Sequence, residues 1–226
     1  MDWFAWHRHY DDSPQMRIRL QTVQGLIADA LDVLPAGPVR VVSICAGDGR
    51  DIIHTTARSR RRNDVAGTLI ERDGRLVAAG ERAITDQALN ARLAFLCDDA
   101  TATATYRGIT PCDLVIAAGV FGNLSPGDTA LFVRLLASVC DAGGYVVWTR
   151  NLVVSDGAKQ VGVIRAQLEA AGFVERRTHS TEEYVVALHQ RREQPLPLPD
   201  APVAFTFTPF TRLAGRRSLS SRVVAA

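Results

Sequence analysis

The sequence lacks several features that define common protein classes. Lys159 is the only lysine, so arginine supplies nearly all of the positive charge, and the formal net charge is only +2. A balanced charge does not favour a protein that binds nucleic acid or a membrane surface. No apolar run is long enough to span a membrane, and the first residues lack the order of a secretory signal peptide. We therefore expect a cytoplasmic protein without nucleic-acid or membrane partners.

Cysteine is also scarce, and its spacing excludes a common type of metal site. None of the four cysteines forms a C-x-x-C pair: Cys45, Cys97, Cys112 and Cys140. Such isolated cysteines are typical of reduced core residues in a cytosolic protein. His7 and His9 lie close together, but no third ligand accompanies them. The sequence therefore predicts no metal site.

Short apolar runs alternate with amphipathic stretches through most of the 226 residues, of which 47% are hydrophobic. The expected strands are 39–45, 65–71, 92–97, 113–118, 145–149, 173–178 and 183–189. The expected helices are 15–33, 50–57, 74–90, 128–140 and 158–171. This alternation predicts an α/β fold with a Rossmann-like, doubly wound, mainly parallel sheet. The last two strands are too close for a parallel crossover and should pair antiparallel.

We expect three parts in the chain. Residues 1–38 hold an aromatic, histidine-rich segment and a first helix, for which Ser13 and Pro14 suit the N-cap and first helical position. Residues 39–191 form the α/β domain. Residues 192–226 hold a proline-rich linker, an alternating stretch at 203–210 that could add an edge strand, and a basic tail.

Two segments allow alternative interpretations. The aromatic start of the chain could fold over a ligand site as a lid, or its rings could attach the first helix to the core. The basic run at 58–62 could bind phosphate, or it could be the solvated end of a helix, where positive charge is also favourable.

Polar residues follow the strands in a consistent pattern. In an open parallel sheet, ligands bind outside the carboxyl ends of the strands. A carboxylate that ends the second strand can accept both hydrogen bonds of a ribose diol, and an aspartate after the third could accept from an adenine amino group. The strands are followed, in chain order, by Gly47–Gly49, Glu71, Asp99, Gly119–Asn123 and Arg150–Asn151.

These residues belong to motifs that resemble the class I S-adenosylmethionine-dependent methyltransferases. The resemblance covers roughly residues 39–190. Its motifs are VSICAGDGRD at 42–51, LIERD at 69–73, CDDA at 97–100, CDLVIAAGVFGN at 112–123 and DAGGYVV at 141–147. It implies a seven-stranded sheet whose last strand is inserted antiparallel.

The resemblance also implies a cofactor, S-adenosyl-L-methionine, with S-adenosyl-L-homocysteine as product. Glu71 would hold the ribose hydroxyls, and Asp99 with Ala100 the adenine edge. Gly47 and Gly49 would lie against the methionine part, with Gly119 near its amino group. The complete set of expected cofactor residues is Ala46, Gly47, Asp48, Gly49, Glu71, Arg72, Asp98, Asp99, Ala100 and Gly119.

One departure from the family pattern concerns the methionine ammonium. Ser43 stands where many members have an acidic residue, and Cys45-Ala46 replaces a glycine there. Asp48 or Asp51 could compensate.

The sulfonium methyl group is already activated, so the protein mainly has to position a nucleophile behind it. A hydroxyl nucleophile would also gain from a general base. The expected catalytic residues are His7, His9, Tyr10 and Asn123, and the expected substrate residues are Trp6, Phe121 and Arg150.

The sequence favours a small molecule with an oxygen or nitrogen nucleophile as the substrate. Residues 118–121 read Ala-Gly-Val-Phe, whereas the amino-directed DNA methyltransferases have Asn/Asp-Pro-Pro-aromatic at this point. No separate substrate domain is evident. The sheet edge and the tail could support a homodimer.

Two other functions remain open. A protein that binds the cofactor without methyl transfer, as a partner subunit or sensor, would share every motif. An NAD(P)-dependent oxidoreductase would also have a glycine turn and a ribose carboxylate, but the third glycine of its G-x-G-x-x-G motif would fall at Ile52.

Overall fold

The computed structural model describes residues 2–7, 9–154 and 156–208, apart from the side chains of Trp3, Trp6 and His9. The strands are β1 (Val39–Ile44), β2 (Val65–Glu71), β3 (Leu93–Cys97), β4 (Cys112–Ala117), β5 (Cys140–Asn151), β6 (Phe173–Ser180) and β7 (Tyr184–Arg191). The helices are α1 (Trp3–His7), α2 (His9–Asp12), α3 (Pro14–Val33), α4 (Arg50–Arg58), α5 (Gly74–Asp86), α6 (Pro126–Val139) and α7 (Gly157–Ala170), with 3-10 helices η1 (Thr103–Tyr106) and η2 (Phe121–Asn123).

The strands form one sheet in the order β3-β2-β1-β4-β5-β7-β6. The pairs β1–β2, β1–β4, β2–β3 and β4–β5 are parallel, whereas β7 runs antiparallel to both β5 and β6. The expected Rossmann-like, mainly parallel sheet with an antiparallel last strand is therefore confirmed.

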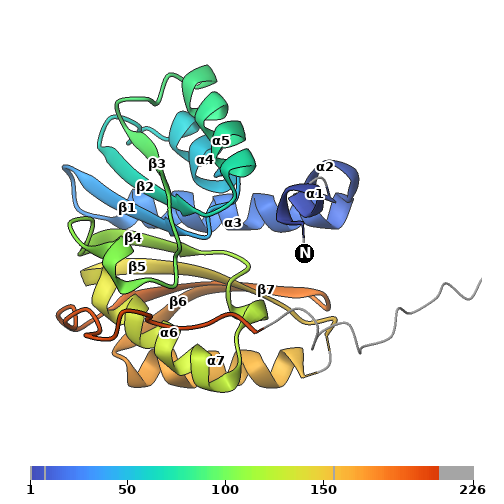
Figure 1. Cartoon of the computed structure of the whole chain (residues 1–226), viewed down its shortest axis with the longest axis vertical. Coiled ribbons are helices and arrows are strands. Elements are labelled where there is room, and N and C mark those ends of the chain that lie inside the picture. The colour runs from blue at the N-terminus through green and yellow to red at the C-terminus, as the bar shows by residue number, and fades with distance from the viewer. Residues whose placement is uncertain (1, 8, 155, 209–226) are drawn as a thin grey trace, which may run out of the picture.

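Helices cover both faces of the sheet, as Figure 1 shows, with α3, α4 and α5 on one face and α6 and α7 on the other. The central strands β1, β4 and β5 are largely apolar on both faces because their side chains pack against helices on each side, whereas the edge strand β6 is mostly polar and exposed. In β1, Val39 and Val41 pack on the side of α3, whereas Val42 and Ile44 pack on the side of α6. The hydrophobic core is thus divided into two layers by the sheet.

Ser13 begins α3 as expected, because its hydroxyl accepts the Met16 N–H at 3.4 Å and Pro14 follows it. In α6, the same arrangement of Ser125 and Pro126 starts the helix two residues before the predicted position. Strand β5 begins at Cys140 rather than at 145, because Cys140 already pairs with β4.

The basic run at 58–62 makes structural contacts. Arg61 is 9% exposed and donates hydrogen bonds to four backbone carbonyl groups at the end of α3: those of Leu31, Leu34, Pro35 and Gly37. The last carbonyl groups of a helix lack partners within the helix, and a guanidinium group can satisfy several at once. Arg62 similarly contacts the carbonyl groups of Gln87 and Ala88. Arg61 is therefore not part of a solvated end of α4, as one interpretation had it, but a buried group that satisfies the end of α3.

The expected edge strand at 203–210 is wrong for the residues that the structure describes. Residues 203–208 make one isolated bridge, between Val203 and Ala102. The N–H groups of Ala204 and Thr208 donate to the carbonyl groups of Thr101 and Asn123, and that of Thr206 donates to the Asp128 carboxylate of α6. The Phe205 ring lies in the core against Phe132, with ring centroids 4.8 Å apart. Packing of this ring against α6 therefore decides the path of the segment, which Figure 1 shows beside that helix. Phe210 and the basic tail lie outside the described residues.

Candidate functional site

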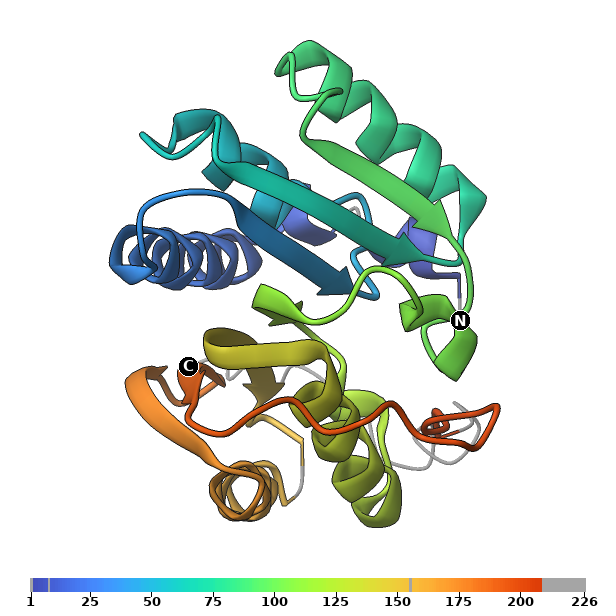
Figure 2. The same cartoon turned by 90° about the vertical axis from the view of Figure 1, so that its left-hand side faces the viewer.

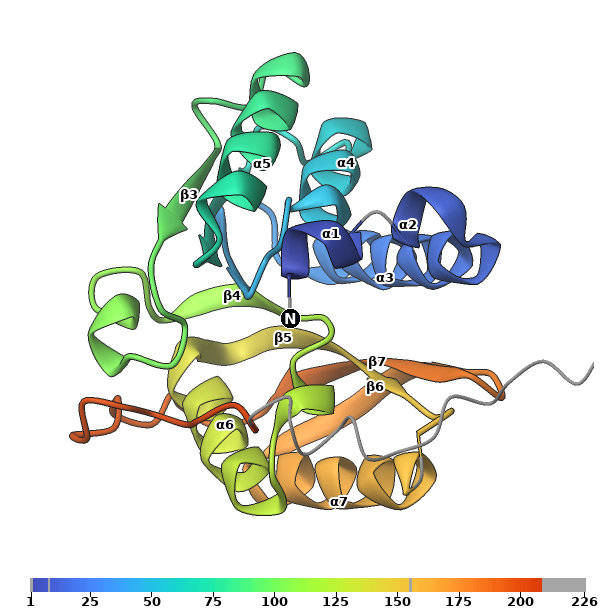
Figure 3. The same cartoon turned by 45° about the vertical axis from the view of Figure 1, so that its right-hand side comes forward.

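The carboxyl ends of the parallel strands β1 to β5 meet at one edge of the sheet. Figure 2 shows the arrowheads of β1, β2 and β3 ending together at this edge. Helices α1 and α2 lie near it, at the start of α3 (Figure 3). The polar residues expected from the sequence follow these strand ends, so the structure brings most of them to one side of the molecule.

The loop after β1 makes the tight turn that was predicted. Gly47 and Gly49 adopt φ angles of +61° and +69°, the left-handed region that favours glycine. A Cβ atom on Gly49 would lie 2.5 Å from a methyl carbon of Leu69, so glycine is also required there for packing. Asp48, between the two glycines, is held by the guanidinium group of Arg50. Burial alone would raise the pKa of Asp48, but these hydrogen bonds and the Arg50 charge lower it overall.

Glu71 joins the second strand to this glycine loop. Its Oε2 accepts the Gly47 N–H at 2.9 Å, and its Oε1 accepts the Arg72 and Asp73 N–H groups at 2.8 Å each. A carboxylate has about four acceptor positions. These three bonds orient the carboxylate and leave acceptor capacity on Oε2.

The segment after β3 places two carboxylates in different environments. Asp98 accepts from the Thr105 hydroxyl, whereas Asp99 accepts from the backbone N–H and hydroxyl of Thr101. Arg72 approaches the other oxygen of Asp99 at 3.4 Å. Burial alone would raise the pKa of Asp99, but the Thr101 and Arg72 contacts lower it overall. Asp99 is therefore ionised at neutral pH.

Ala100 is buried directly after these carboxylates. Its carbonyl group accepts the hydroxyl proton of Tyr106 at 2.6 Å, which anchors the loop to η1.

Asp51 is a buried carboxylate that the sequence motifs did not assign to the cofactor set. It lies at the start of α4 and its Oδ1 accepts the Ile52 N–H at 2.7 Å. Burial raises the pKa of Asp51 to about 6, with this hydrogen bond opposing the shift and the nearby Asp48 charge adding to it. A perturbed carboxylate beside a glycine loop is a candidate ligand-binding group.

The end of β4 carries a network that sequence analysis missed. Gly119 has a φ angle of +80°, and its N–H donates to the Thr149 hydroxyl at 2.8 Å. Arg19 of α3 donates to the same hydroxyl oxygen at 2.6 Å. The Asn123 amide donates to the Gly119 carbonyl at 2.9 Å, so Asn123 lies at the strand-end loop as predicted. No sequence motif marks Arg19, because it lies 130 residues from Thr149 in the chain.

Part of the aromatic N-terminal segment lies directly on the glycine loop. A Cβ atom on Gly47 would lie 2.2 Å from His7 Nε2, so the imidazole covers that glycine. The Tyr10 ring lies 5.9 Å from the His7 ring and 5.0 Å from the Arg50 guanidinium carbon. Burial raises the pKa of Tyr10, and the charge of Arg19 opposes that shift. The side chains of His9 and Trp6, also expected at the site, lie outside the described part of the structure.

The structure does not present the Phe121 ring to the strand-end site. Phe121 is 1% exposed and packs edge-on against Phe132 and Trp148, because η2 turns its ring into the α6 side of the core. We therefore correct its assignment to the substrate. Arg150 is 5% exposed and its Nε donates to Gln160 of α7 at 3.1 Å.

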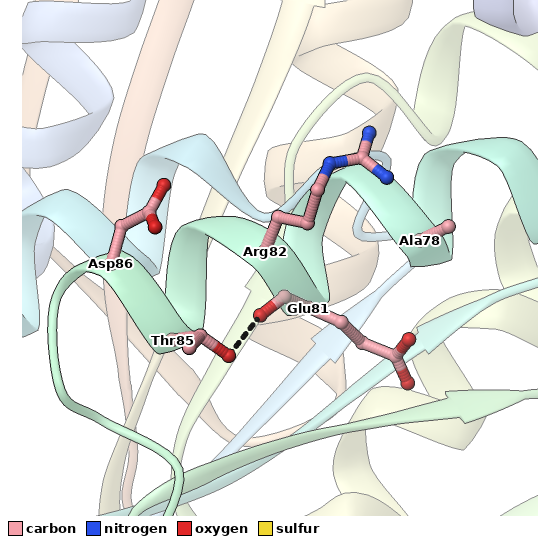
Figure 4. A pocket seen from close by; sticks show the side chains of 5 residues that line it. All are labelled: Ala78, Glu81, Arg82, Thr85 and Asp86. Carbon is pink, nitrogen blue, oxygen red and sulfur yellow. Dashed lines mark hydrogen bonds between the residues drawn. The ribbon is translucent and has the colours of Figure 1, made fainter.

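Two of the shallow hollows on the described surface contribute little to this site. The larger, of roughly 420 Å³, runs along α5 alone and is lined by Ala78, Glu81, Arg82, Thr85 and Asp86. Figure 4 shows these side chains, with the Thr85 hydroxyl donating to the Glu81 carbonyl. The smaller, of roughly 270 Å³, adjoins the glycine loop through Asp48 and Arg50.

The described residues lack two kinds of feature. They contain no cluster of three or more histidine, cysteine or acidic side chains that could hold a metal ion. None of the helices within them is both long and apolar enough to cross a membrane.

Comparison with known proteins identifies a family. Residues 13–177 match the family described as "Putative methyltransferase". No curated protein matches the sequence.

Solved structures share the fold. Magnesium protoporphyrin IX methyltransferase from Synechocystis PCC 6803, crystallised with bound SAH, is 18% identical with a TM-score of 0.63, over 82% of this chain and 92% of that one. An O-methyltransferase family protein from Burkholderia thailandensis is 17% identical with a TM-score of 0.61, over 84% of this chain and 61% of that one. The chain thus spans less than two thirds of the Burkholderia protein. An O-methyltransferase family 2 protein from Planctomyces limnophilus, in complex with apigenin, is 15% identical with a TM-score of 0.57, over 78% and 60%.

Proposed function

Because the chain belongs to the methyltransferase family that matches residues 13–177, we propose that it transfers the methyl group of S-adenosylmethionine to a small-molecule oxygen or nitrogen nucleophile. The observation that carries this proposal is the hydrogen bond between the Gly47 N–H and the Glu71 carboxylate, at 2.9 Å. It joins the glycine loop after β1 to the acid that ends β2. A nucleoside with an amino-acid side chain needs these two groups next to each other.

The residues at the strand ends fit this cofactor. Glu71 retains acceptor capacity on Oε2 for a ribose hydroxyl group, and Asp99 is ionised with one oxygen contacted only by Arg72 at 3.4 Å. The left-handed turn at Gly47 and Gly49 allows a ligand to approach the backbone closely. The remaining residues of the proposed cofactor site are Ala46, Asp48, Asp98, Ala100 and Gly119. Asp51 joins them as a buried carboxylate for the methionine ammonium, since Ser43 supplies no charge.

When bound, the cofactor supplies an electrophilic methyl group, so the chain mainly has to bind and orient the acceptor. Asn123 orients the loop after β4 through its bond to the Gly119 carbonyl. The raised pKa of Tyr10 keeps its phenol protonated at neutral pH, which favours a hydrogen-bonding role. His7 is the described candidate for accepting a proton, and His9 the second one. A small acceptor is favoured over nucleic acid by the net charge of +2.

We further propose that α1 and α2 form a lid over the glycine loop. Two ion pairs hold them there: Asp2 with Arg75 at 2.8 Å, and Asp11 with Arg50 at 3.2 Å. Exposed ion pairs contribute little to stability, and the same two arginines also stack on the rings of Tyr10 and Phe4. The lid is therefore held at the glycine loop mainly through Arg50 and Arg75. Since the His7 imidazole covers Gly47, the lid has to open for cofactor to reach that glycine and can then close to exclude water.

Two alternatives remain. Cofactor binding without methyl transfer would use the same residues, and only turnover distinguishes it. An NAD(P)-dependent oxidoreductase has less support, because Ile52 stands at the position of the third glycine and is fully buried.

The first test is calorimetric titration of wild type and Glu71→Ala with S-adenosylmethionine, S-adenosylhomocysteine and NADH. We expect micromolar binding of both adenosyl ligands, at least tenfold weaker binding to Glu71→Ala and no binding of NADH. Glu182→Ala removes an exposed glutamate between β6 and β7 and serves as the control. Absence of adenosyl-ligand binding to the wild type would refute the proposal, and NADH binding in its place would favour the oxidoreductase.

Turnover is tested next with phenols, carboxylic acids and amines as acceptors. Formation of S-adenosylhomocysteine together with a methylated acceptor supports methyl transfer. Tight cofactor binding with no product from any acceptor class favours the non-catalytic alternative.

A further inference from the structure

Arg19 is a cation at the strand-end edge without an anionic partner among the described residues. Its guanidinium group forms one hydrogen bond, from Nη2 to the Thr149 hydroxyl at 2.6 Å. None of the ion pairs in the described part of the chain includes it. Its Nε is buried and lacks a hydrogen-bond partner. A half-buried arginine with an unsatisfied N–H group is costly unless another group, such as a ligand, accepts a hydrogen bond from it.

The surroundings of Arg19 hold it at the end of β4. The Thr149 side chain is buried, and its oxygen accepts both from Arg19 and from the Gly119 N–H. Arg19 Nη2 lies 3.8 Å from the position of a Cβ atom on Gly119. Thr149 is therefore a positioning residue that holds the guanidinium group beside Gly119, and no described residue accepts a hydrogen bond from Arg19 Nη1.

A guanidinium group presents a planar fork of donors that matches a carboxylate, and such charge-assisted pairs are strong. In an amino acid the ammonium and carboxylate groups are attached to the same carbon atom. If the ammonium of the cofactor lies near Gly119, its carboxylate has to lie within a few ångströms. An acceptor that approaches the same edge could also carry a carboxylate.

We propose that Arg19 binds a carboxylate in the active site, namely that of the amino-acid end of the cofactor or that of an acidic acceptor. The proposal rests on the proposed function, because it places the ligand at the same strand ends. Tyr10 is close enough for the Arg19 charge to oppose the rise that burial causes in the Tyr10 pKa.

The experiment compares wild type, Arg19→Met and Arg19→Lys in calorimetric titrations. The ligands are S-adenosylhomocysteine and 5′-methylthioadenosine, which lacks the amino-acid carboxylate. Arg82→Met makes the same chemical change at an exposed site on α5 and serves as the control. Thermal melts of each variant establish that the protein is folded.

If the cofactor carboxylate is the partner of Arg19, Arg19→Met weakens the binding of S-adenosylhomocysteine at least tenfold and leaves the binding of methylthioadenosine unchanged. The affinity of Arg19→Lys lies between those of wild type and Arg19→Met, since lysine keeps the positive charge but lacks the planar fork of donors.

A second set of titrations tests whether the carboxylate belongs to the acceptor. With S-adenosylhomocysteine present at saturation, the same proteins are titrated with 4-hydroxybenzoate and with its uncharged methyl ester. Binding of the acid that is lost in Arg19→Met, with the ester unaffected, assigns Arg19 to the acceptor. Affinities that are equal in wild type and Arg19→Met in both arms would overturn the proposal for Arg19 but leave the proposed function standing. Wild type that binds neither nucleoside would refute the proposed function, and this proposal with it.

Discussion

Single residues at the strand ends have their roles set by backbone geometry and by the groups that surround them. Gly47 exemplifies this, since its left-handed φ angle and its contact with His7 both favour a residue without a side chain, while its N–H donates to Glu71. Gly108 has a comparable φ angle of +81°, but no atom lies within 4 Å of the position of its Cβ. Comparing the two glycines separates the effect of backbone strain from the proposed role of Gly47 in ligand binding.

We expect Gly47→Ala and Gly108→Ala each to lower the free energy of unfolding by about 1 kcal/mol, because both put alanine in the left-handed region. Only Gly47→Ala should also weaken S-adenosylhomocysteine binding, by tenfold or more, since its methyl group would occupy the face of the loop now covered by His7. Urea unfolding and calorimetry check the two expectations. Equal affinity of both variants would contradict a role for Gly47 in the site.

At the scale of elements, the pairing of β5 with β7 buries a histidine. The Trp148 indole N–H donates to His189 Nδ1 at 3.1 Å, so that nitrogen has to remain unprotonated. Burial, with the Arg165 charge adding to it, lowers the pKa of His189 to about 4. Glu175 lies 3.8 Å from the other ring nitrogen, but its charge is largely compensated by Arg165 at 2.7 Å. The contact between Trp148 and His189 is therefore most favourable when the imidazole is neutral.

This predicts a pH dependence of stability. In the unfolded chain His189 binds a proton below its ordinary pKa of about 6.5, whereas the native state resists protonation until about pH 4. The contribution of the neutral His189 to stability is therefore complete above pH 6.5 and is lost as the pH falls toward 4. When the pH falls from 7.5 to 4.5, the free energy of unfolding of the wild type should decrease by about 2 kcal/mol more than that of His189→Gln. Urea unfolding at several pH values measures this, with the exposed His179→Gln as control. Parallel pH profiles for wild type and His189→Gln would show that the native imidazole does ionise.

At the scale of the whole molecule, the segment 192–208 links distant parts of the fold. Leu196 N–H bonds to the Ala137 carbonyl at the end of α6, and Thr208 N–H bonds to the Asn123 carbonyl in the loop after β4. Phe205 is 1% exposed in the core between these points. The segment is thus part of the α6 layer and contacts the candidate site through the loop after β4.

We expect Phe205→Ala to lower the free energy of unfolding by about 3 to 5 kcal/mol, because it leaves a cavity against Phe132. Phe207 is 38% exposed, so Phe207→Ala should cost about 1 kcal/mol and serves as the matched variant. Chemical denaturation of both proteins gives the comparison. A loss below 1 kcal/mol for Phe205→Ala would mean that the segment is not an integral part of the core.

Much of the fold and part of the site could be predicted from local sequence. Strand β2 lies at the predicted residues, and the turn with Gly47 and Gly49 forms where the glycines indicated it. Both depend on interactions between neighbours in the chain: apolar runs that need two covered faces, and turns that need a left-handed residue. Glu71 could be placed for the same reason, because the end of a parallel strand determines where its side chain lies.

The tertiary structure decided the features that depend on contacts between distant residues. Arg19 meets Thr149 across 130 residues, and Phe205 joins a core formed by α6 and β5. The Phe121 ring turns into that core, although its position in a strand-end loop had suggested a substrate contact. No local pattern encodes such contacts, because they arise only when the sheet brings its strand ends together. Local sequence was thus sufficient for the sheet and its strand-end loops, whereas packing between distant segments set which further side chains surround those loops.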